Sequence, residues 1–275
     1  MKVFKKLMNG FVLFLVSLVT FFPLLWMFSN SFKNTDKIIR EPLNLIPEFF
    51  DFRNFIGALK QAPFDLYIIN SIFTALVIVI LQILVGILLA YGLSRFEYKG
   101  KKLLFGAILL TYMLPSAATY VPSYVILAKL NLIDTILGII ISNSASVFTI
   151  YMIYQTFSSV PKELIEAAEM DGANNWQILW NVLVPISKST ILTTALIQFV
   201  AMYNNYMWPS LITNSKKNYL ISVGLKIFFN SRGNFAQNLP MLMAANAISV
   251  LPLLILFFIL QKWFIKGISD SGVKG

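Results

Sequence analysis

Long apolar segments alternate with short charged ones along the chain. Six long stretches contain no Asp, Glu, Lys or Arg: Leu7–Phe32, Leu66–Ser94, Leu103–Ala128, Thr135–Pro161, Ser189–Ser215 and Gly233–Gln261. Each exceeds the roughly 20 apolar residues that a helix needs to cross the hydrocarbon core of a bilayer. The pattern therefore predicts an all-α polytopic membrane protein. We expect a single transmembrane domain over 1–275, with six transmembrane helices at about 9–32, 66–94, 103–127, 135–157, 189–212 and 241–262.

A seventh charge-free stretch, Gly172–Ser187, differs from these six. It is much shorter and holds several amide side chains and a proline: Asn174, Asn175, Gln177, Asn181 and Pro185. Because it is too short and too polar to cross a membrane, we assign it to a loop, residues 161–185, between the fourth and fifth spans.

Composition narrows the class of protein. Hydrophobic residues make up 57% of the chain and charged residues 12%, whereas about 25% are charged in soluble domains, and the mean hydropathy is +0.74. The chain has no Cys and no His, which excludes disulfides, thiolate catalysis and imidazole metal sites. We therefore expect no catalytic residue, no metal site and no nucleic-acid partner. The net charge of +10 suits contact with a lipid bilayer that carries anionic headgroups.

The sequence offers no energy source for transport. The interiors of the six expected spans lack the ionisable side chains that proton-coupled transporters use. The chain also lacks the Gly-x4-Gly-Lys-Ser/Thr motif that cradles ATP phosphates. We expect no cofactor on this chain. A pump built on it needs a partner that binds ATP, whereas a passive facilitator needs none.

The flanking charges predict an orientation. Six spans put both termini and the second and fourth loops on one side, which holds twelve of the 22 Lys and Arg residues. Three lysines and no acid precede the first span, and Arg95–Lys102 carries four basic residues against Glu97 alone. The first loop of the other side, Lys33–Asp65, balances five basic with five acidic residues. The excess of basic residues places both termini and the 161–185 loop in the cytoplasm.

The amino-terminal segment begins as a signal peptide does, with Lys2, Lys5 and Lys6 before an apolar run. The run continues to Phe32 without a small-residue cleavage site and contains Pro23. We interpret it as a retained membrane anchor.

The 161–185 loop has the pattern of two short helices joined by a turn. Pro161 suits the first turn of a helix, and Glu163, Glu166 and Glu169 recur near that positive end of the helix dipole. Gly172 suits the left-handed position that ends a helix.

A second helix of this loop can begin at Asn174 or Asn175 as N-cap. Its apolar side chains are expected on one side: Trp176, Leu179, Trp180 and Leu183. Pro185 marks the break before the fifth span. The local pattern leaves two interpretations, a docking element for another protein and an amphipathic loop that only anchors the bilayer surface. A DNA-reading helix–turn–helix is excluded because the stretch is acidic, whereas phosphate contacts need Lys and Arg.

The spacing within this loop matches a known motif. Glu166-Ala167-Ala168, then three residues, Gly172, then nine residues, and Val182-x-Val184-Pro185 resemble the Glu-Ala-Ala loop of ABC importer permeases. Asp171, Gly172 and Ala173 form the Asp-Gly-Ala that sugar permeases commonly carry there. The resemblance implies that the loop docks in a cleft of a cytoplasmic ATPase and couples ATP-driven closure to the membrane helices. It also implies roles in this coupling for Glu166, Ala167, Ala168, Asp171, Gly172, Ala173 and Pro185.

Further segments resemble the shorter permease subunit of the maltose-type carbohydrate importers. They are "FPLLWMFSNSFK", "NSIFTALVIVILQILVGILLAYGLSRFEYKGKK", "MLPSAATYVPSYVILAKLNLIDT" and "YNNYMWPSLIT". The resemblance implies a type I ABC importer permease in the plasma membrane of a prokaryote, transporting a sugar. The implied partners are a second permease subunit, two cytoplasmic ABC ATPase subunits that bind the ATP, and an extracytoplasmic solute-binding protein. A non-sugar solute such as a polyol or glycerol phosphate, and a facilitative pore, are the alternatives.

Neutral polar residues within the spans are candidates for the substrate pathway, because amides and aromatic faces recognise sugars. They are Asn143, Gln198, Tyr203, Asn204, Asn205 and Tyr206. The alternative is that each amide bonds a neighbouring helix, as polar residues in helix bundles do, and that Tyr206 belongs to an interfacial aromatic belt. The 214–240 loop either reaches toward the binding protein or is a disordered connector. We expect Pro115, Pro122, Pro209 and Pro252 to kink their helices.

Overall fold

The computed structural model describes residues 2–229 and 235–272, and these residues are helical apart from their short connections. The chain divides into two compact units, one of residues 1–65 and 224–254 and the other of residues 66–223 and 255–275.

The first unit contains a long helix followed by short ones. These are α1 (Lys2–Asn30), α2 (Thr35–Arg40), α3 (Arg53–Gln61), α15 (Lys226–Phe229) and the first part of α16 (Phe235–Gly272). The connection after α1 is folded back by hydrogen bonds: Trp26 Nε1 donates to the Pro42 carbonyl over 2.6 Å, and Asn54 Nδ2 donates to the Ser31 carbonyl over 2.9 Å. The connection is therefore ordered and closely tied to the end of α1.

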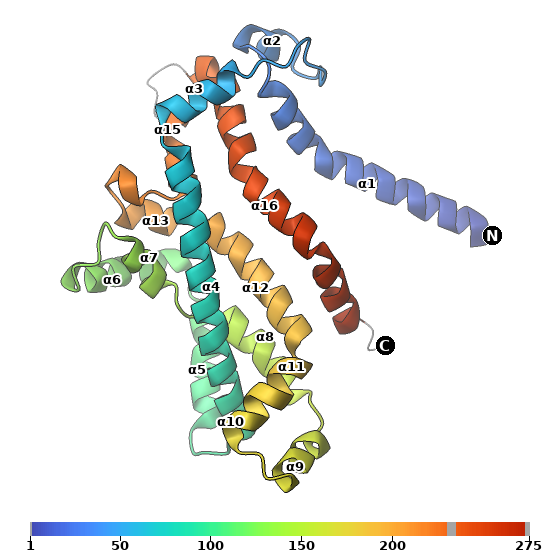
Figure 1. Ribbon diagram of the computed structural model, residues 1–275, viewed down its shortest axis with the longest axis vertical. Coiled ribbons are helices and arrows are strands. Elements are labelled where there is room, and N and C mark those ends of the chain that lie inside the picture. Colours follow the sequence, from blue (N-terminus) through green and yellow to red (C-terminus); the bar gives the residue numbers. More distant parts are fainter. Residues whose placement is uncertain (1, 230–234, 273–275) are drawn as a thin grey trace. The chain divides into compact units, whose positions relative to one another are not determined.

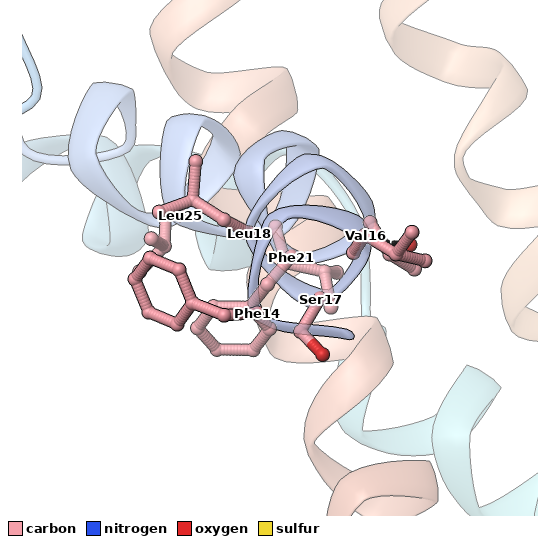
Figure 2. Close-up of a pocket in the computed structure, with 8 residues that line it drawn as sticks. Phe14, Val16, Ser17, Leu18, Phe21 and Leu25 are labelled. Carbon is pink, nitrogen blue, oxygen red and sulfur yellow. Dashed lines mark hydrogen bonds between the residues drawn. The ribbon is translucent and has the colours of Figure 1, made fainter. Parts of the chain in front are cut away.

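Most described side chains of α1 are exposed. Eight of them line a shallow apolar hollow, from Phe14 to Leu25 (Figure 2). Only Ser17 and Thr20 in this set are polar, and every wall of the hollow belongs to the same helix. The hollow is the corrugated surface of a membrane-spanning helix, and we do not treat it as a binding site.

The second unit contains the remaining helices that the sequence predicts as spans (Figure 1). They are α4 (Phe64–Arg95), α5 (Lys101–Met113), α6 (Ser116–Lys129), α7 (Ile136–Ser142), α8 (Val147–Ser158), α12 (Lys188–Tyr203) and α13 (Met207–Ile212). Helix α8 packs against both α5 and α12. Helix α4 is continuous over 32 residues, a length of about 48 Å.

Two of the six expected spans are bent pairs of helices, and a third bent pair joins the second helix of the 161–185 loop to α12. The pair α5 and α6 bends by 104°, the pair α7 and α8 by 43°, and the segment Asn175–Ile186 bends by 75° against α12. The first bend lies at Leu114 and Pro115, where proline lacks an N–H and forces the residue before it into an extended conformation (Leu114 ψ 131°). With each bent pair counted as one span, the described chain has six apolar spans, as the sequence predicts.

The bounds of the last two spans differ from those expected. Helix α12 ends at Tyr203, and α13 begins at Met207, so the 189–212 segment is two helices. Helix α16 begins at Phe235, earlier than the expected 241, and continues through Pro240 and Pro252.

The 214–240 loop also differs from a disordered connector. Short helices occupy much of it: η2 (Lys216–Asn218), α14 (Ile221–Gly224) and α15. Residues 230–234 of this loop lie outside the described residues.

A single carboxylate fixes the turn between α6 and α7 to the segment after α13. Asp134 Oδ1 accepts hydrogen bonds from the backbone N–H of Asn214 (2.8 Å) and of Ser215 (2.9 Å), and the Ser215 hydroxyl donates to Oδ2. Asp134 adopts a left-handed backbone conformation with φ 58°. Burial opposes its ionisation, but the hydrogen bonds from Ser215, Asn214 and Asn218 outweigh it and lower the pKa of Asp134 to about 2. Asp134 is therefore ionised whenever the protein is folded near neutral pH.

Candidate coupling site

The first helix of the 161–185 loop is α9 (Lys162–Met170), and Pro161 precedes it as N-cap with φ −55°. Ile165 is the buried residue of this helix, with 2% of its surface exposed, whereas Glu166 and Ala167 are exposed. The helix therefore has an apolar side turned to the protein and a side with a carboxylate and a small residue turned outward, as an amphipathic docking helix requires.

The carboxyl end of α9 is closed by Gly172. Its φ of 81° lies in the left-handed region, and its N–H donates to the Glu169 carbonyl over 3.0 Å. The N–H of Ala173 donates to the Ala168 carbonyl, also over 3.0 Å. These two bonds form a Schellman motif, which satisfies two of the last carbonyls of the helix. The prediction that Gly172 ends this helix is confirmed.

The second helix begins where the sequence predicts. Asn174 is its N-cap: Asn174 Oδ1 accepts from the Gln177 N–H (2.9 Å), and Gln177 Oε1 accepts from the Asn174 N–H (2.8 Å). This reciprocal capping box stabilises the start of α10 (Asn175–Gln177). Helix α10 continues into η1 (Ile178–Leu183), a π-helical stretch, and then into α11 (Val184–Ile186). The 75° bend follows α11, just after Pro185.

The buried side of this second helix differs from the predicted one. The prediction placed Trp176 with Leu179 and Leu183, but 61% of the Trp176 surface is exposed, and Ile178 is buried instead. Trp176 lies in α10, before the π-helical stretch that begins at Ile178, and packing on the apolar cluster selects Ile178, Leu179 and Leu183. Trp180 is half-buried and contacts Trp176 edge to face at 5.8 Å.

Both helices of the loop share one apolar cluster with two membrane helices. The cluster consists of α4 and α8 residues together with residues of α9 and η1: Ile87, Ala90, Tyr91, Ile153, Phe157, Val160, Ile165, Ile178, Leu179 and Leu183. Ala168 and Ala173 are half-buried against it. The loop is therefore packed onto the ends of α4 and α8 through its small and apolar side chains.

Two polar contacts reinforce this packing. Arg95, the last residue of α4, forms an ion pair with Glu169 at 2.9 Å between Nη2 and Oε1. The Tyr91 hydroxyl donates to Asn175 Oδ1 over 3.0 Å. Sequence reasoning counted Arg95 only as a loop charge and did not single out Tyr91. Because each residue meets its partner from another part of the chain, no local pattern could have paired them.

The remaining predicted coupling residues form the outer surface of the loop. Glu166, Ala167, Asp171, Gly172 and Pro185 are all exposed. Met170 and Trp176 are exposed on the loop as well. A surface of carboxylates, small residues and apolar side chains on a firmly packed support suits docking into a partner that supplies basic side chains.

The predicted pathway residues gather at two breaks in helices of the second unit. Asn143 follows α7, where its Nδ2 donates to the Ile139 carbonyl and its own carbonyl accepts from Gln82 Nε2, both over 2.8 Å. Gln198 is 7% exposed and donates from Nε2 to Ser146 Oγ and to Thr149 Oγ1. The Gln198 amide thus joins α12 to the start of α8, whereas the Asn143 amide bonds back to its own helix and its backbone carbonyl receives Gln82 from α4. These partners favour structural hydrogen bonding over substrate contact.

The other four predicted residues lie at the break between α12 and α13. Tyr203 is buried and stacks on Phe199 at 6.1 Å, while Asn204 and Tyr206 are exposed. The Asn205 carbonyl accepts from the Ser222 hydroxyl over 2.7 Å. The structure therefore leaves Asn204 and Tyr206 as the members of the set best placed to contact a solute or a partner.

Gln82 was recorded from the sequence as a neutral polar residue but not as a site residue. Its Oε1 is buried and has no hydrogen-bond partner among the described residues, whereas its Nε2 crosses from α4 to the end of α7. Within the described part of the chain, no group of three or more Asp or Glu residues has the arrangement of a metal site.

The fold and this loop define a membrane-spanning transport subunit of the ABC importer class. Residues 82–270 match the family described as binding-protein-dependent transport system inner membrane component, and the chain belongs to this family.

Similar proteins cover nearly the whole chain. The arabinooligosaccharides transport system permease protein AraQ of Halalkalibacterium halodurans is 27% identical over 94% of this chain and 93% of its own. The lactose transport system permease protein LacG of Rhizobium radiobacter is 30% identical over 94% of this chain and 93% of its own. The sn-glycerol-3-phosphate transport system permease protein UgpE of Yersinia pestis is 30% identical over 92% of each chain.

A solved structure shares the fold. A chain from a bacterial ABC transporter involved in the import of the acidic polysaccharide alginate superimposes with a TM-score of 0.83 at 26% identity, covering 96% of this chain and 97% of that one. The chain is thus a membrane-embedded transport permease and belongs to a family of transport components, not of enzymes.

Proposed function

We propose that this chain forms one half of the translocation pathway of an ATP-driven sugar importer. In this proposal, a second permease forms the other half, an extracytoplasmic binding protein delivers the sugar, and two cytoplasmic ATPase subunits bind and hydrolyse the ATP. Both chain termini and the 161–185 loop lie in the cytoplasm, as the charge distribution favours.

The observation that carries the proposal is the two-sided construction of the 161–185 loop. Its apolar side is packed on α4 and α8, and its outer side exposes Glu166 and Ala167. The outer side also exposes Met170 and Trp176. Carboxylates and small residues beside these apolar side chains suit a protein partner that supplies basic groups. A facilitative pore has no use for an exposed docking surface on a rigid support.

The class of solute is inferred from the side chains at the break between α12 and α13. The exposed residues Asn204 and Tyr206 offer an amide and a phenol, which bind hydroxyl groups. No Lys or Arg lies in the interior of the six expected spans to neutralise a phosphate. The relatives include permeases for arabinooligosaccharides and for lactose. These observations favour a neutral sugar over a phosphorylated solute such as that of UgpE.

The coupling assignment is tested at Gly172. No atom lies within 4 Å of a Cβ added there, so Gly172→Val acts only through the backbone, where a left-handed conformation costs about 1–2 kcal/mol. Gly100 provides a matched control, because it also has a positive φ, 90°, and empty surroundings but lies outside the 161–185 loop. The detergent-solubilised complex is purified from the native membrane, and the ATPase and second permease that accompany each variant are quantified.

We expect wild type and Gly100→Val to recover both partners, and Gly172→Val to recover roughly tenfold less ATPase, in line with typical effects of disrupting an interface residue. Equal ATPase recovery with a well-expressed Gly172→Val protein would refute the coupling role. Recovery of wild type alone, with uptake insensitive to ATP depletion, would support the facilitator instead.

The solute class is tested by competition. Uptake of a labelled oligosaccharide into cells is measured with excess unlabelled lactose, arabinooligosaccharide or sn-glycerol-3-phosphate. We expect a neutral sugar to compete. Competition by sn-glycerol-3-phosphate alone would contradict the sugar assignment and leave the ABC assignment unaffected.

A further inference from the structure

Helix α4 differs from the other long helices in its stiffness. Three described helices are each long and apolar enough to cross a membrane unbroken. Of these, α1 contains Pro23 and α16 contains Pro240 and Pro252, whereas α4 contains no proline. Two further spans are bent by 43° and 104°, and α12 meets the helix before it at 75°. An unbroken helix resists bending, so a displacement applied at one end of α4 reaches its other end.

The Arg95 end of α4 is bound to the 161–185 loop. Figure 1 shows α9 and α10 at this end of the helix. Three α4 residues, Ile87, Ala90 and Tyr91, belong to the apolar cluster that holds both helices of the loop. The Arg95–Glu169 ion pair and the Tyr91–Asn175 hydrogen bond add one polar contact to each helix of the loop. Arg95 is the less exposed partner of the ion pair, with 23% of its side chain exposed against 50% for Glu169.

The opposite end of α4 is bound to the segment that follows α13. Asn70 Nδ2 donates to the carbonyls of Lys217 (2.9 Å) and Tyr219 (3.1 Å). The buried Ser71 hydroxyl accepts the N–H of Ile221 over 2.7 Å. The same segment is fixed at Ser215 by Asp134. Residues 215–221 therefore move with the first turns of α4.

We propose that α4 is a strut that carries the displacement of the 161–185 loop through the membrane to residues 215–221, and that Arg95 and Tyr91 are the positioning residues that bind the loop to it. The inference rests on the proposed function, in which an ATPase displaces the loop. It assigns the transmission to a helix that lies far upstream of the loop in sequence, and not only to α8 and α12, which flank the loop.

The ion pair is suited to this role because it acts at the edge of an already packed interface. The apolar cluster holds the loop against α4 but is non-directional. The guanidinium and carboxylate fix the direction in which α9 lies relative to the helix axis. Loss of the ion pair should therefore leave the loop folded but allow α9 to shift along α4. A variant without the pair then tests the transmission of movement without unfolding the loop.

The decisive experiment is a charge swap in the complete reconstituted transporter, with its ATPase, second permease and binding protein. The variants are Arg95→Glu, Glu169→Arg and the two together, and the measurement is solute transported per ATP hydrolysed. Lys101→Glu is the control, since the Lys101–Glu97 pair (2.8 Å) follows α4 directly and neither of its residues lies in the 161–185 loop, although Lys162 of the loop acts electrostatically on Glu97.

We expect each single reversal to lower transport per ATP by roughly tenfold, within the usual range of coupling between two sites. The double reversal should restore it to within about threefold of wild type, because the pair is re-formed with opposite polarity. Lys101→Glu should stay within about twofold of wild type. A double reversal that is no better than the single ones in equally assembled complexes would overturn the proposal.

Two further measurements test the role of α4 if the Arg95→Glu complex assembles poorly. Tyr91→Phe removes only the hydroxyl that bonds Asn175, and we expect a loss of transport per ATP of roughly threefold with unchanged assembly. An unchanged ratio would count against the strut.

The chain contains no Cys, so spin labels can be placed at Leu88→Cys on α4 and Met170→Cys on α9, both exposed positions. We expect the same distance between the two labels with and without ATP. A nucleotide-dependent distance in wild type would overturn the proposal. A wild-type complex that lacks ATP-dependent transport would instead contradict the proposed function itself.

Discussion

The two ends of α4 are fastened to their neighbouring segments in different ways. At the Arg95 end, an apolar cluster does most of the holding, and one partly exposed ion pair lies at its edge. Toward the other end, Leu220 belongs to a second apolar cluster with Ile78 of α4, and Asn70 and Ser71 bond the backbone of residues 217–221. Asp134, in the turn between α6 and α7, accepts further hydrogen bonds from Asn214, Ser215 and Asn218 of that segment. The second attachment therefore adds a group of hydrogen bonds to its apolar contacts.

The difference shows what each attachment can transmit. A carboxylate that accepts several backbone and side-chain donors fixes a turn in one conformation, because any displacement breaks several hydrogen bonds together. An apolar cluster keeps its contact energy through small displacements, so it can remain intact while the elements that it joins move as one body. Residues 214–218 are thus fixed in shape, and the 161–185 loop is fixed mainly in its attachment.

The largest effect should come from removing a buried side chain of the apolar cluster. Leu179 is fully buried, so Leu179→Ala should destabilise the assembled protein by about 2–5 kcal/mol through lost burial and the cavity left behind. Thermal unfolding in detergent measures the loss. Trp176→Ala in the same helix is the control, since Trp176 is exposed and should cost less than about 1 kcal/mol. Equal losses for the two variants would mean that the cluster does not hold the loop.

An intermediate effect is expected at the other end. Asparagine tolerates the left-handed backbone conformation of Asp134, so Asp134→Asn should not strain the turn. The amide has a single acceptor oxygen, however, so the Ser215 hydroxyl loses the oxygen to which it donates. We expect a loss of about 1–3 kcal/mol in stability. Faster proteolysis near residues 214–218, with the 161–185 loop unaffected, would locate the effect. Faster cleavage of both segments alike would show that the two attachments are not independent.

The smallest effect is a dependence on pH. The pKa of Asp134 falls from an ordinary value of about 3.9 to about 2 in the folded protein. A group whose pKa is depressed by folding stabilises the protein above its unfolded pKa and loses that contribution as the pH falls through its folded pKa. The stability difference between wild type and Asp134→Asn should therefore be constant from pH 7 to 5 and shrink between about 4 and about 2. A difference that does not change down to pH 2 would contradict this role of the carboxylate.

Local patterns predicted those features that depend on neighbouring residues. The charge-free stretches located the six apolar spans because a buried charge in a membrane is costly. Gly172 and Asn174 were correctly identified as helix ends, since a positive φ and an N-cap each select few residue types. The bend at Pro115 was also predictable from the missing proline N–H.

Features set by distant contacts were not predictable in this way. Arg95 and Glu169 are far apart in sequence, and no pattern between them pairs the two. Trp176 is exposed and Ile178 is buried because the apolar cluster with α4 and α8 determines which side of this helix is covered, and the local sequence pattern does not contain that contact. Gln198 was predicted as a pathway residue on its residue type alone, and only the structure gives it Ser146 and Thr149 as partners.

The break between α7 and α8 determines what the fourth span can face. Residues 136–158 together make about one bilayer crossing, and the break at 143–146 lies near their middle. Backbone that leaves the helix at this depth cannot be solvated by acyl chains. Ser142 and Ala145 are nevertheless exposed on this chain. The backbone at the break is served instead by protein groups, because the N–H groups of Asn143 and Ser144 bond the end of α7 and Gln82 donates to the Asn143 carbonyl. A side chain of α4 therefore does at this depth what water does at a loop on a protein surface.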